Sequence, residues 1–596
     1  MDDHRPPEAA PTPRVPPPTV PQPRPAEAEP PARKRPTSLD PQELGFTPQR
    51  PVGWLAPLLL LSTGLRTLLA ILFGAYLDKR ELQNALDGDV FTQTGTDGEI
   101  WLDYVSDLGD GFHATYSVAY LLAQPRLEVG GQLLPRGGVL LMGGDQVYPL
   151  ASGDGYESRT KGPYRAALPE APAGGRPTLY ALPGNHDWYD GLTAFLRLFA
   201  RRKDSHIGGW RTGQRRSYFA VKLPSDWWLF AIDEQFGAYI DDPQLLYFEK
   251  AAEGVGPDDR IILMTPSPTW VKAADDPGRY DAVDYFIRTI LGPTGAHVRL
   301  LVSGDLHHYA RYTGEDRELI TCGGGGAYLL GTHALPGELI VPPRETLTRN
   351  ASRSRRYTLA SAFPDFPTSK RMGWGVFKRI AVRNPGFATM LGILQTLTML
   401  AMSGAASSDG GPIRRLFSIP LVLMLVLIMT GTVLFAKPPG AGLAKHARHW
   451  ILGVSHGAAQ IALAAGGTWL WQRLPFHDWT WPGPLIVAVV LYLPVIGFVS
   501  TQVCALYLLV ASKFKVNVNE LYAGQGIEDG KSFLRMHIDR DGTLTVYPLG
   551  VDRICRRWVA DPGGTGAASW LRPEESLDVR LIEEPIRVAG PQEARH

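Results

Sequence analysis

Short apolar runs alternate with amphipathic stretches between residues 90 and 370. Each run leads into polar residues, and the clearest examples are GGVLLMGGD, TLYALPGNHD, RIILMTPSP and VRLLVSGDLHH. An apolar run of this length, bounded by turn residues, is typical of a buried strand, and stretches such as 191–202 and 244–252 have helical spacing. Strands that alternate with helices along the chain predict an α/β fold for residues 90–370.

Four longer apolar segments lie within residues 385–512, at 386–406, 416–436, 450–471 and 484–511. Each is long enough to span the hydrocarbon core of a membrane, and together they predict a transmembrane helical bundle. Lysine and arginine are more frequent in the connections that flank this region, and in the one at its centre, than in the other two connections. We therefore expect an integral protein of the cell membrane, with its α/β domain on the cytoplasmic side.

The remaining parts of the chain differ from both of these regions. Residues 1–50 are rich in proline and charge, which predicts a disordered tail. Residues 51–80 contain an apolar segment with Arg66 near its middle, and both a membrane-spanning and an interfacial helix remain open for it. Residues 513–585 alternate polar and apolar positions about a turn at 540–542, which predicts a small β-rich cytoplasmic domain.

The composition limits the classes of partner. A chain of 596 residues is expected to form several domains, and its 60 Lys and Arg against 59 Asp and Glu leave a net charge of +1. This balance gives no reason to expect nucleic acid as a partner. The 3 cysteines, Cys322, Cys504 and Cys555, match neither a disulfide framework nor a zinc site, which favours a reducing compartment.

Polar motifs that could bind metal follow the apolar runs of the α/β region. They are SDLGDG with Asp107, GGDQVY with Asp145 and Tyr148, GNHD with Asn185, His186 and Asp187, and GDLHHY with Asp305, His307 and His308. The carboxyl ends of neighbouring parallel strands meet at one edge of a sheet, so we expect these side chains to converge. Carboxylate, phenol, amide and imidazole groups together suit one or two ions of Fe, Mn, Zn or Mg.

In this order the motifs resemble the calcineurin-like metallophosphoesterase family, and GDxxY with GNH(D/E) is most similar to its purple-acid-phosphatase branch. The resemblance covers roughly residues 100–330. It implies a four-layer αββα sandwich and an enzyme that hydrolyses a phosphate mono- or diester with metal-activated water. Together with the predicted transmembrane helices, this predicts a membrane-anchored phosphoesterase.

The resemblance also implies a role for each motif residue. The first metal ion would be bound by Asp107, Tyr148 and His307, and Asp145 would bridge two ions. Asn185 would bind the second ion. His186 would lie beside the substrate and donate a proton or a hydrogen bond to the phosphoryl oxygens, and Asp187 is a further catalytic candidate in the same motif.

Two departures from the family pattern concern the second metal ion. The family has a histidine after the run RIILM, where this chain has Thr265, Pro266, Ser267 and Pro268. Asp305 replaces the first histidine of the family's GHxH motif. Three consequences stay open, namely a harder second ion bound by Asp305, a weakly bound second ion, or a single-metal site.

Further candidates would bind the substrate. Arg159, Lys161 and Arg311 could pair with phosphate oxygens, and His308 could orient a ligand, although solvated surface charge is the alternative for each cation. The substrate would be a phosphorylated small molecule or a lipid-derived phosphate, with membrane lipid as the surrounding partner. A second function stays open, in which the same fold binds a metal or phosphorylated ligand without turnover and acts as a membrane sensor or scaffold.

Overall fold

In a computed structural model of the chain, the described residues are 34–62, 88–200, 205–234, 239–344, 351–407, 418–436 and 447–588, together with Gln83 and Gly411. Most of the predicted disordered tail, and the part of the apolar segment beyond residue 62, lie outside the described residues. The choice between a spanning and an interfacial helix at 51–80 therefore stays a prediction.

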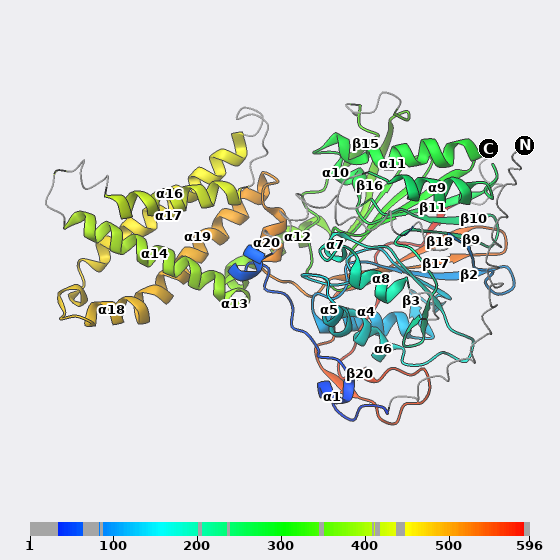
Figure 1. The fold of residues 1–596 in the computed structure, drawn as a ribbon, viewed down its shortest axis with the longest axis horizontal. Helices are drawn as coiled ribbons and strands as arrows, with labels where there is room; N and C mark the ends of the chain where they lie inside the picture. Colours follow the sequence, from blue (N-terminus) through cyan, green and yellow to red (C-terminus); the bar gives the residue numbers. More distant parts are fainter. Residues whose placement is uncertain are drawn as a thin grey trace, which may run out of the picture. The chain divides into compact units, whose positions relative to one another are not determined.

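Two large sheets form the α/β region (Figure 1). The first sheet contains β1 (Phe91–Thr92), β9 (Phe219–Leu223), β10 (Trp227–Ala231), β11 (Arg260–Thr265), β12 (His297–Ser303), β13 (Tyr309–Thr313), β14 (Glu318–Cys322), β15 (Glu338–Val341) and β16 (Arg355–Phe363). Its strand order is β1-β9-β10-β11-β12-β14-β13-β16-β15. The strands β10, β11, β12 and β14 are parallel neighbours.

The second sheet contains β2 (Ile100–Val105), β5 (Val139–Met142), β6 (Thr178–Ala181), β7 (Ser205–Ile207), β8 (Trp210–Thr212), β17 (Lys531–Ile538), β18 (Leu544–Val551), β21 (Arg580–Leu581) and β22 (Ile586–Val588). Its order is β21-β18-β17-β2-β5-β6-β8-β7, and β22 also pairs with β18. Because β2, β5 and β6 run parallel, their carboxyl ends lie at one edge of this sheet.

Apolar side chains place the two sheets between two layers of helices. One buried cluster is drawn from both sheets and includes Leu141, Leu229 and Val302. A second cluster joins the second sheet to α4 (Phe112–Ala123), α6 (Gly162–Ala167) and α8 (Thr193–Phe199), and a third joins the first sheet to α9 (Asp242–Ala252) and α11 (Asp281–Phe286). Figure 1 shows α9 and α11 on one side of the sheets and α4 and α6 on the other. The predicted mixed α/β class is confirmed.

The C-terminal strands belong to the second sheet and do not form the separate small domain that we expected at 513–585. The predicted hairpin forms, but β17 pairs with β2, with Leu534 opposite Tyr104. Nearly every side chain of β17 is buried, so the strand needs a packed layer on both of its faces. Arg535 of this strand lies 2.7 Å from the Asp103 carboxylate inside the protein.

The described part of the N-terminal tail is also more ordered than predicted. Asp40 accepts a hydrogen bond from the Gln42 amide at 2.8 Å and caps α1 (Pro41–Leu44). Leu44 and Phe46 are buried, and the ring of Phe46 lies 6.1 Å from that of Phe112. The prediction of disorder over residues 34–50 is wrong because these two apolar side chains anchor a proline-rich segment.

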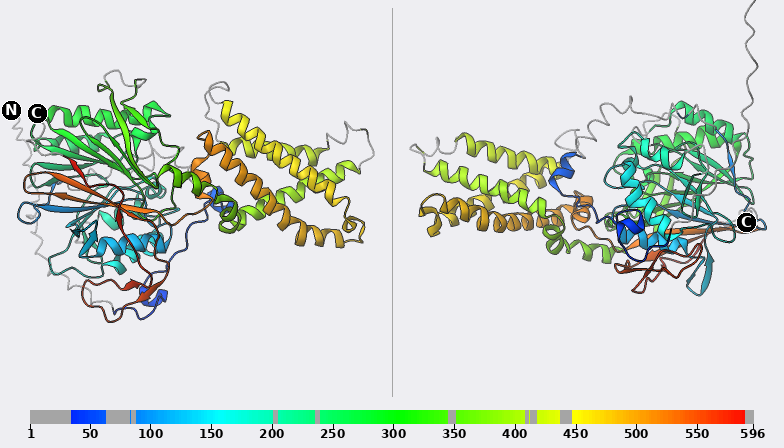
Figure 2. Two further views of the ribbon diagram at one scale, coloured as in Figure 1. Left: turned by 180° about the vertical axis from the view of Figure 1, so that it is seen from behind. Right: turned by 60° about the horizontal axis from the view of Figure 1, so that its bottom comes forward.

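Helices α12 (Phe366–Gly373), α13 (Val376–Arg383) and α20 (Val518–Ala523) flank the predicted membrane region. The region itself contains α14 (Pro385–Ala406), α16 (Ile419–Phe435), α17 (Ala447–Trp471), α18 (Gly483–Val487) and α19 (Leu493–Lys513). Two continuous helical stretches among the described residues, Pro385–Ala406 and Gly483–Lys513, are long and apolar enough to cross a membrane, and Ile419–Phe435 is apolar but shorter. Figures 1 and 2 show α14, α16, α17 and α19 side by side.

Small and amide side chains hold these helices together. A Cβ atom on Gly392 of α14 would lie 2.5 Å from the Leu493 carbonyl oxygen, so the close contact with α19 requires glycine. The side-chain Oε1 of Gln460 accepts hydrogen bonds from the Gln395 side-chain amide at 2.9 Å and from the Ser500 hydroxyl at 2.7 Å. One buried amide thus connects α14, α17 and α19.

Candidate functional site

Loops that follow several strands bring four of the predicted metal-binding side chains together. Asp107 follows β2, Asp145 and Tyr148 follow β5, and His307 follows β12. The Tyr148 hydroxyl lies 2.9 Å from Oδ1 of Asp107, 3.1 Å from Oδ2 of Asp145 and 3.0 Å from Nε2 of His307. All four residues are buried. We call these four residues the Tyr148 cluster.

The aspartates at three of these strand ends share an uncommon backbone conformation. Asp107, Asp145 and Asp305 have φ angles of 63°, 49° and 67°, in the left-handed region. Few residues other than glycine adopt it, although aspartate tolerates it better than most. Such a conformation costs about 1–3 kcal/mol and is concentrated at functional sites. The left-handed conformation therefore serves to place the three carboxylates and does not stabilise the loops.

Glycines in the motifs make room for the carboxylates of neighbouring loops. A Cβ atom on Gly304 would lie 1.8 Å from the Ser106 hydroxyl and 2.5 Å from Oδ2 of Asp107. A Cβ atom on Gly184 would lie 2.1 Å from Oδ1 of Asp145. The glycines of GDLHHY and GNHD are therefore required by contacts between motifs that are distant in sequence.

The electrostatics of the Tyr148 cluster favour a cation. Burial raises the pKa of Asp107 well above its ordinary value, and the charges of Asp145 and Asp305 raise it further. Burial also raises the pKa of Asp145, with Asp305 adding to it and His186 opposing it. Buried carboxylates that repel one another are unfavourable without a positive partner. A cation bound among them would remove this cost.

His307 presents a neutral nitrogen to the cluster. Burial lowers the pKa of His307 to about 3. Its Nδ1 lies 3.0 Å from the Tyr328 carbonyl oxygen, so the Nδ1–H group donates there. The lone pair of Nε2 then faces the Tyr148 hydroxyl, and a carbonyl partner on the opposite nitrogen is the usual arrangement for a metal-binding histidine.

The donor set fits a hard metal ion. Two carboxylates, a phenol and a neutral imidazole suit Fe, Mn, Zn or Mg. Among the described residues, no three His, Cys, Asp or Glu side chains are arranged as a metal-binding group. The Tyr148 hydroxyl lies between the carboxylates and the imidazole and links them through hydrogen bonds.

The GNHD motif begins α7 (Asn185–Trp188), and His186 lies beside the cluster. Its backbone N–H donates to Oδ1 of Asp145 at 2.8 Å, and its ring centroid lies 4.4 Å from that of Tyr148. Nδ1 of His186 is 2.7 Å from the Pro149 carbonyl oxygen, which leaves Nε2 available. The side-chain amide of Asn185 lies 3.5 Å from the Tyr189 hydroxyl.

The Asp187 carboxylate is hydrogen-bonded within the protein, which differs from its predicted catalytic role. Its carboxylate accepts hydrogen bonds from the Gly184 amide at 2.8 Å, from the Gln146 amide at 3.3 Å and from the Tyr156 hydroxyl. Asp187 is the third residue of α7, where a carboxylate commonly binds the amide that precedes the helix. It therefore fixes the loops that carry Asp145 and His186 and is a positioning residue.

Asp305 is close to the cluster but has its own cation. Its backbone N–H donates to Oδ2 of Asp107 at 2.9 Å. Its carboxylate lies 2.5 Å from Nζ of Lys272, on α10 (Thr269–Lys272), and 3.3 Å from the Ser267 hydroxyl. Burial alone would raise the pKa of Asp305, but the Lys272 ammonium outweighs it and the pKa lies below its ordinary value. The motifs gave no sign of Lys272, which follows the run RIILM.

Two of the predicted substrate-binding cations, Arg311 and Arg159, bind groups of the protein itself. Arg311 lies between Glu583 and Glu318, at 2.5 and 3.0 Å, so it is not a free cation for phosphate as predicted. Arg159 donates to the carbonyl oxygens of Gly109 and Asp110 and supports the loop after β2. The sequence could not distinguish such internal partners from phosphate.

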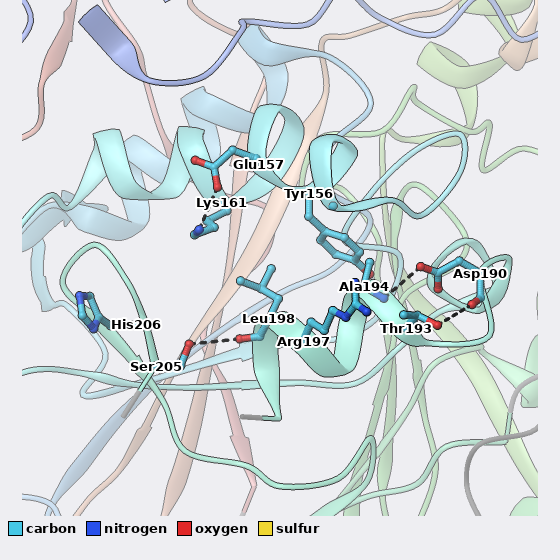
Figure 3. Close-up of a pocket in the computed structure, with 11 residues that line it drawn as sticks. Tyr156, Glu157, Lys161, Asp190, Thr193, Ala194, Arg197, Leu198, Ser205 and His206 are labelled. Carbon is cyan, nitrogen blue, oxygen red and sulfur yellow. Dashed lines mark hydrogen bonds and ion pairs between the residues drawn. The ribbon is translucent and has the colours of Figure 1, made fainter. Parts of the chain in front are cut away.

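Lys161 and His308 also differ from their predicted roles. Lys161 pairs with Glu157 at 2.8 Å and lines a cavity of about 450 Å³ with Tyr156 and Arg197 (Figure 3). His308 is buried, burial lowers its pKa to about 4, and neither ring nitrogen has a hydrogen-bond partner among the described residues. A neutral, enclosed imidazole of this kind is better suited to packing than to binding phosphate.

Trp54 covers the cluster and was not predicted. Its ring contacts those of Tyr148, His186 and Tyr328 edge-on, at centroid distances of 5.5, 5.7 and 5.3 Å. Asp110, the second aspartate of SDLGDG, accepts a hydrogen bond from the Trp54 indole at 3.3 Å. The beginning of the apolar segment in residues 51–80 therefore lies against the candidate site.

Comparisons with known proteins give only distant similarities. No family model matches the sequence, and no curated protein matches it. Among solved structures, GAP50, the anchor in the inner membrane complex of Plasmodium, is 11% identical with a TM-score of 0.29, and the match covers 46% of this chain and 93% of that one.

Two further solved structures are as distant. Purple acid phosphatase PPD1 from seeds of yellow lupin (Lupinus luteus) is 12% identical with a TM-score of 0.29, over 41% of this chain and 46% of that one. PhoD is 9% identical with a TM-score of 0.28, over 39% of this chain and 58% of that one. At such low TM-scores, the function has to be inferred from the side chains of the site.

Proposed function

We propose that this protein is a membrane-anchored, metal-dependent phosphoesterase that hydrolyses a phosphate mono- or diester. The observation that carries the proposal is the Tyr148 cluster, in which two carboxylates and a neutral imidazole lie within 3.1 Å of one buried phenol oxygen. Loops from different strands supply these groups, and three aspartates beside or within the cluster adopt strained backbone conformations. The helix–sheet–sheet–helix order of the α/β region agrees with the αββα sandwich of metallophosphoesterases.

Asp107, Asp145, Tyr148 and His307 would hold the metal ion. Such an ion would supply Lewis-acid stabilisation of the phosphoryl oxygens and a water of lowered pKa. The protein itself fixes the donors, because Gly184 and Gly304 bring the loops into contact and Asp187 holds the GNHD loop. These contacts reduce the reorganisation that the site would otherwise undergo during the reaction.

His186 would move the proton. Its Nδ1–H group donates to the Pro149 carbonyl, so the imidazolium form presents its second proton from Nε2. From this position His186 can donate to a phosphoryl or leaving-group oxygen, as expected of a general acid. The Trp54 and Tyr148 rings both pack against its imidazole and limit its rotation.

Anchoring to a membrane rests on the helices Pro385–Ala406 and Gly483–Lys513, which have the necessary length and apolar composition. The side chain of Asn384, directly before α14, accepts a hydrogen bond from the Leu55 amide at 3.1 Å and donates to the Gly524 carbonyl at 2.8 Å. A site beside such helices is suited to a lipid-derived phosphate, although a soluble phosphorylated molecule has the same reacting group.

Hydrolysis by the full-length chain in detergent tests the proposal. We expect turnover of p-nitrophenyl phosphate or bis(p-nitrophenyl) phosphate with at least one of Mn²⁺, Fe²⁺, Zn²⁺ and Mg²⁺, and a loss of about 10³-fold in Asp145→Asn. Asp258→Asn is the matched control, because Asp258 is exposed on a surface loop. Metal binding without turnover of either ester would overturn the proposal and favour the sensor or scaffold.

A further inference from the structure

The part of the site around Asp305 lacks the donors that a second metal ion requires. Where the metallophosphoesterase pattern has an imidazole, the Thr265 hydroxyl donates to the Ser267 carbonyl at 2.9 Å, and the intervening Pro266 has no side-chain donor atom. The Asn185 amide lies against the Tyr189 hydroxyl. Asp305 is therefore the main charged residue that could bind a second metal ion here. Its carboxylate already contacts Lys272 and Ser267.

A built-in cation occupies this position. Nζ of Lys272 lies 2.5 Å from Oδ2 of Asp305, and the Ser267 hydroxyl donates to the same oxygen at 3.3 Å. Lys272 also stands near Glu234, a buried residue whose carboxylate oxygens have no hydrogen-bond partner among the described residues. Burial raises the pKa of Glu234 to about 8, and the Lys272 ammonium opposes this rise. The Lys272 ammonium thus pairs with Asp305 and also acts electrostatically on Glu234.

Lys272 is also accessible to a ligand. Its side chain is 37% exposed, whereas that of Asp305 is 19% exposed. An ammonium group has three N–H donors, and the contact with Asp305 uses only part of that capacity. The remaining donors can reach a phosphate oxygen, which lysine binds as a point charge.

We propose that the Lys272 ammonium replaces the second metal ion, so that the site binds one ion at the Tyr148 cluster and uses Lys272 to bind a phosphate oxygen. This inference rests on the proposed phosphoesterase function. The second ion of two-metal phosphoesterases does not fit the residues around Asp305, and the lysine supplies its positive charge without a ligand set.

Metal stoichiometry of the full-length chain in detergent is the first test. Titration with Mn²⁺, followed by calorimetry and by the electron paramagnetic resonance of bound Mn²⁺, should give one ion per chain with the signal of an isolated ion. Two ions per chain, or the signal of a coupled pair, would overturn the inference while leaving the phosphoesterase proposal intact. Failure to bind any Mn²⁺, with no turnover in any metal, would overturn both.

Binding of inorganic phosphate to the Mn²⁺-loaded protein tests the role of Lys272. We expect Lys272→Met to weaken phosphate binding by about 10- to 100-fold and to keep one Mn²⁺ at the cluster, whereas Lys272→Arg should retain most of the affinity. Arg279→Met is the control, because Arg279 is an exposed cation on the following helical turn that pairs with Asp276. Unchanged phosphate affinity in Lys272→Met would contradict the inference, and ester hydrolysis would still report on the proposed function separately.

Discussion

The two halves of the candidate site balance their negative charge in different ways. In the Tyr148 cluster, Asp107 and Asp145 are buried around a phenol, and burial and mutual repulsion raise the pKa of Asp107. In the other half, the ammonium of Lys272 outweighs burial and lowers the pKa of Asp305. A raised pKa thus marks the buried carboxylate that has no cation beside it, and a lowered pKa marks the carboxylate that is paired with a lysine.

Removing a carboxylate from the Tyr148 cluster should have the largest effect. We expect Asp107→Asn to lose Mn²⁺ binding and to lower ester hydrolysis by about 10³-fold. The metal-free variant should unfold at the same or a higher temperature than the wild type, because a neutral amide relieves the repulsion while tolerating the left-handed backbone. Calorimetric Mn²⁺ titration and thermal unfolding measure the two effects, and a variant with full metal affinity would show that the cluster is not the metal site.

The two halves should respond to pH in opposite directions in the metal-free protein. Because folding raises the pKa of Asp107, its contribution to stability is present below the ordinary pKa of 3.8 and is lost as the pH rises through the raised value. The pKa of Asp305 is lowered on folding, so its contribution is present above 3.8 and is lost as the pH falls through the lowered value.

Unfolding temperatures between about pH 3 and pH 9 separate these contributions. Relative to the wild type, Asp107→Asn should lose less stability on the alkaline side, and Asp305→Asn should lose less on the acidic side. If both variants follow the wild-type curve, the proposed difference between the halves is wrong.

A double-mutant cycle sharpens the comparison with a smaller effect. Lys272→Met alone leaves Asp305 without its partner, whereas Lys272→Met combined with Asp305→Asn removes both charges. We expect a coupling free energy on the order of 1 kcal/mol, reduced because the Lys272 side chain is 37% exposed. Chemical denaturation of the four proteins measures it, and additive effects would show that the pair does not stabilise the fold.

Lys161→Met should have the smallest effect. Lys161 pairs with Glu157 at 2.8 Å, and both side chains are about one third exposed, at 35% and 32%. Such a pair contributes about 0–1 kcal/mol, so we expect little change in stability and an unchanged KM for p-nitrophenyl phosphate. A clear rise in KM would show that Lys161 binds the phosphate ester and would count against phosphate binding by Lys272.

The sequence predicted that Asp107, Asp145, Tyr148 and His307 come together because each motif directly follows a strand. Asp107, Asp145 and Tyr148 follow neighbouring parallel strands of the second sheet, but His307 follows β12 of the first sheet, so the expectation of a single sheet edge is wrong. Lys272 and Trp54 could not be predicted in the same way. Each contacts the site from a segment without a motif, and no local spacing marks a contact with Asp305 or His186. Arg311 was assigned to phosphate because guanidinium groups pair with phosphate oxygens. Its internal partner Glu583 was missed because it is distant in the sequence.

For the fold, too, local patterns could be predicted from the sequence and long-range contacts could not. Alternating strands and helices predicted the α/β class, since the hydrophobic period is a local property. The place of β17 beside β2 was missed because the alternation of polar and apolar residues in 513–585 also fits a separate small domain. The ion pair between Arg535 and Asp103 joins two strands that are distant in the sequence. Long-range ion pairs of this kind are invisible to any local pattern.

The position of β17 between β2 and β18 means that the second sheet is completed late in translation. The ribosome completes the strands up to β16 and then the apolar helices before it makes residues 531–551. Until then, β2 has an open edge that could pair with another chain, and Asp103 lacks its guanidinium partner. The second sheet can be completed only after the helices have emerged, so a fragment that ends at residue 370 would lack β17 and β18 and would be a poor substitute for the whole protein.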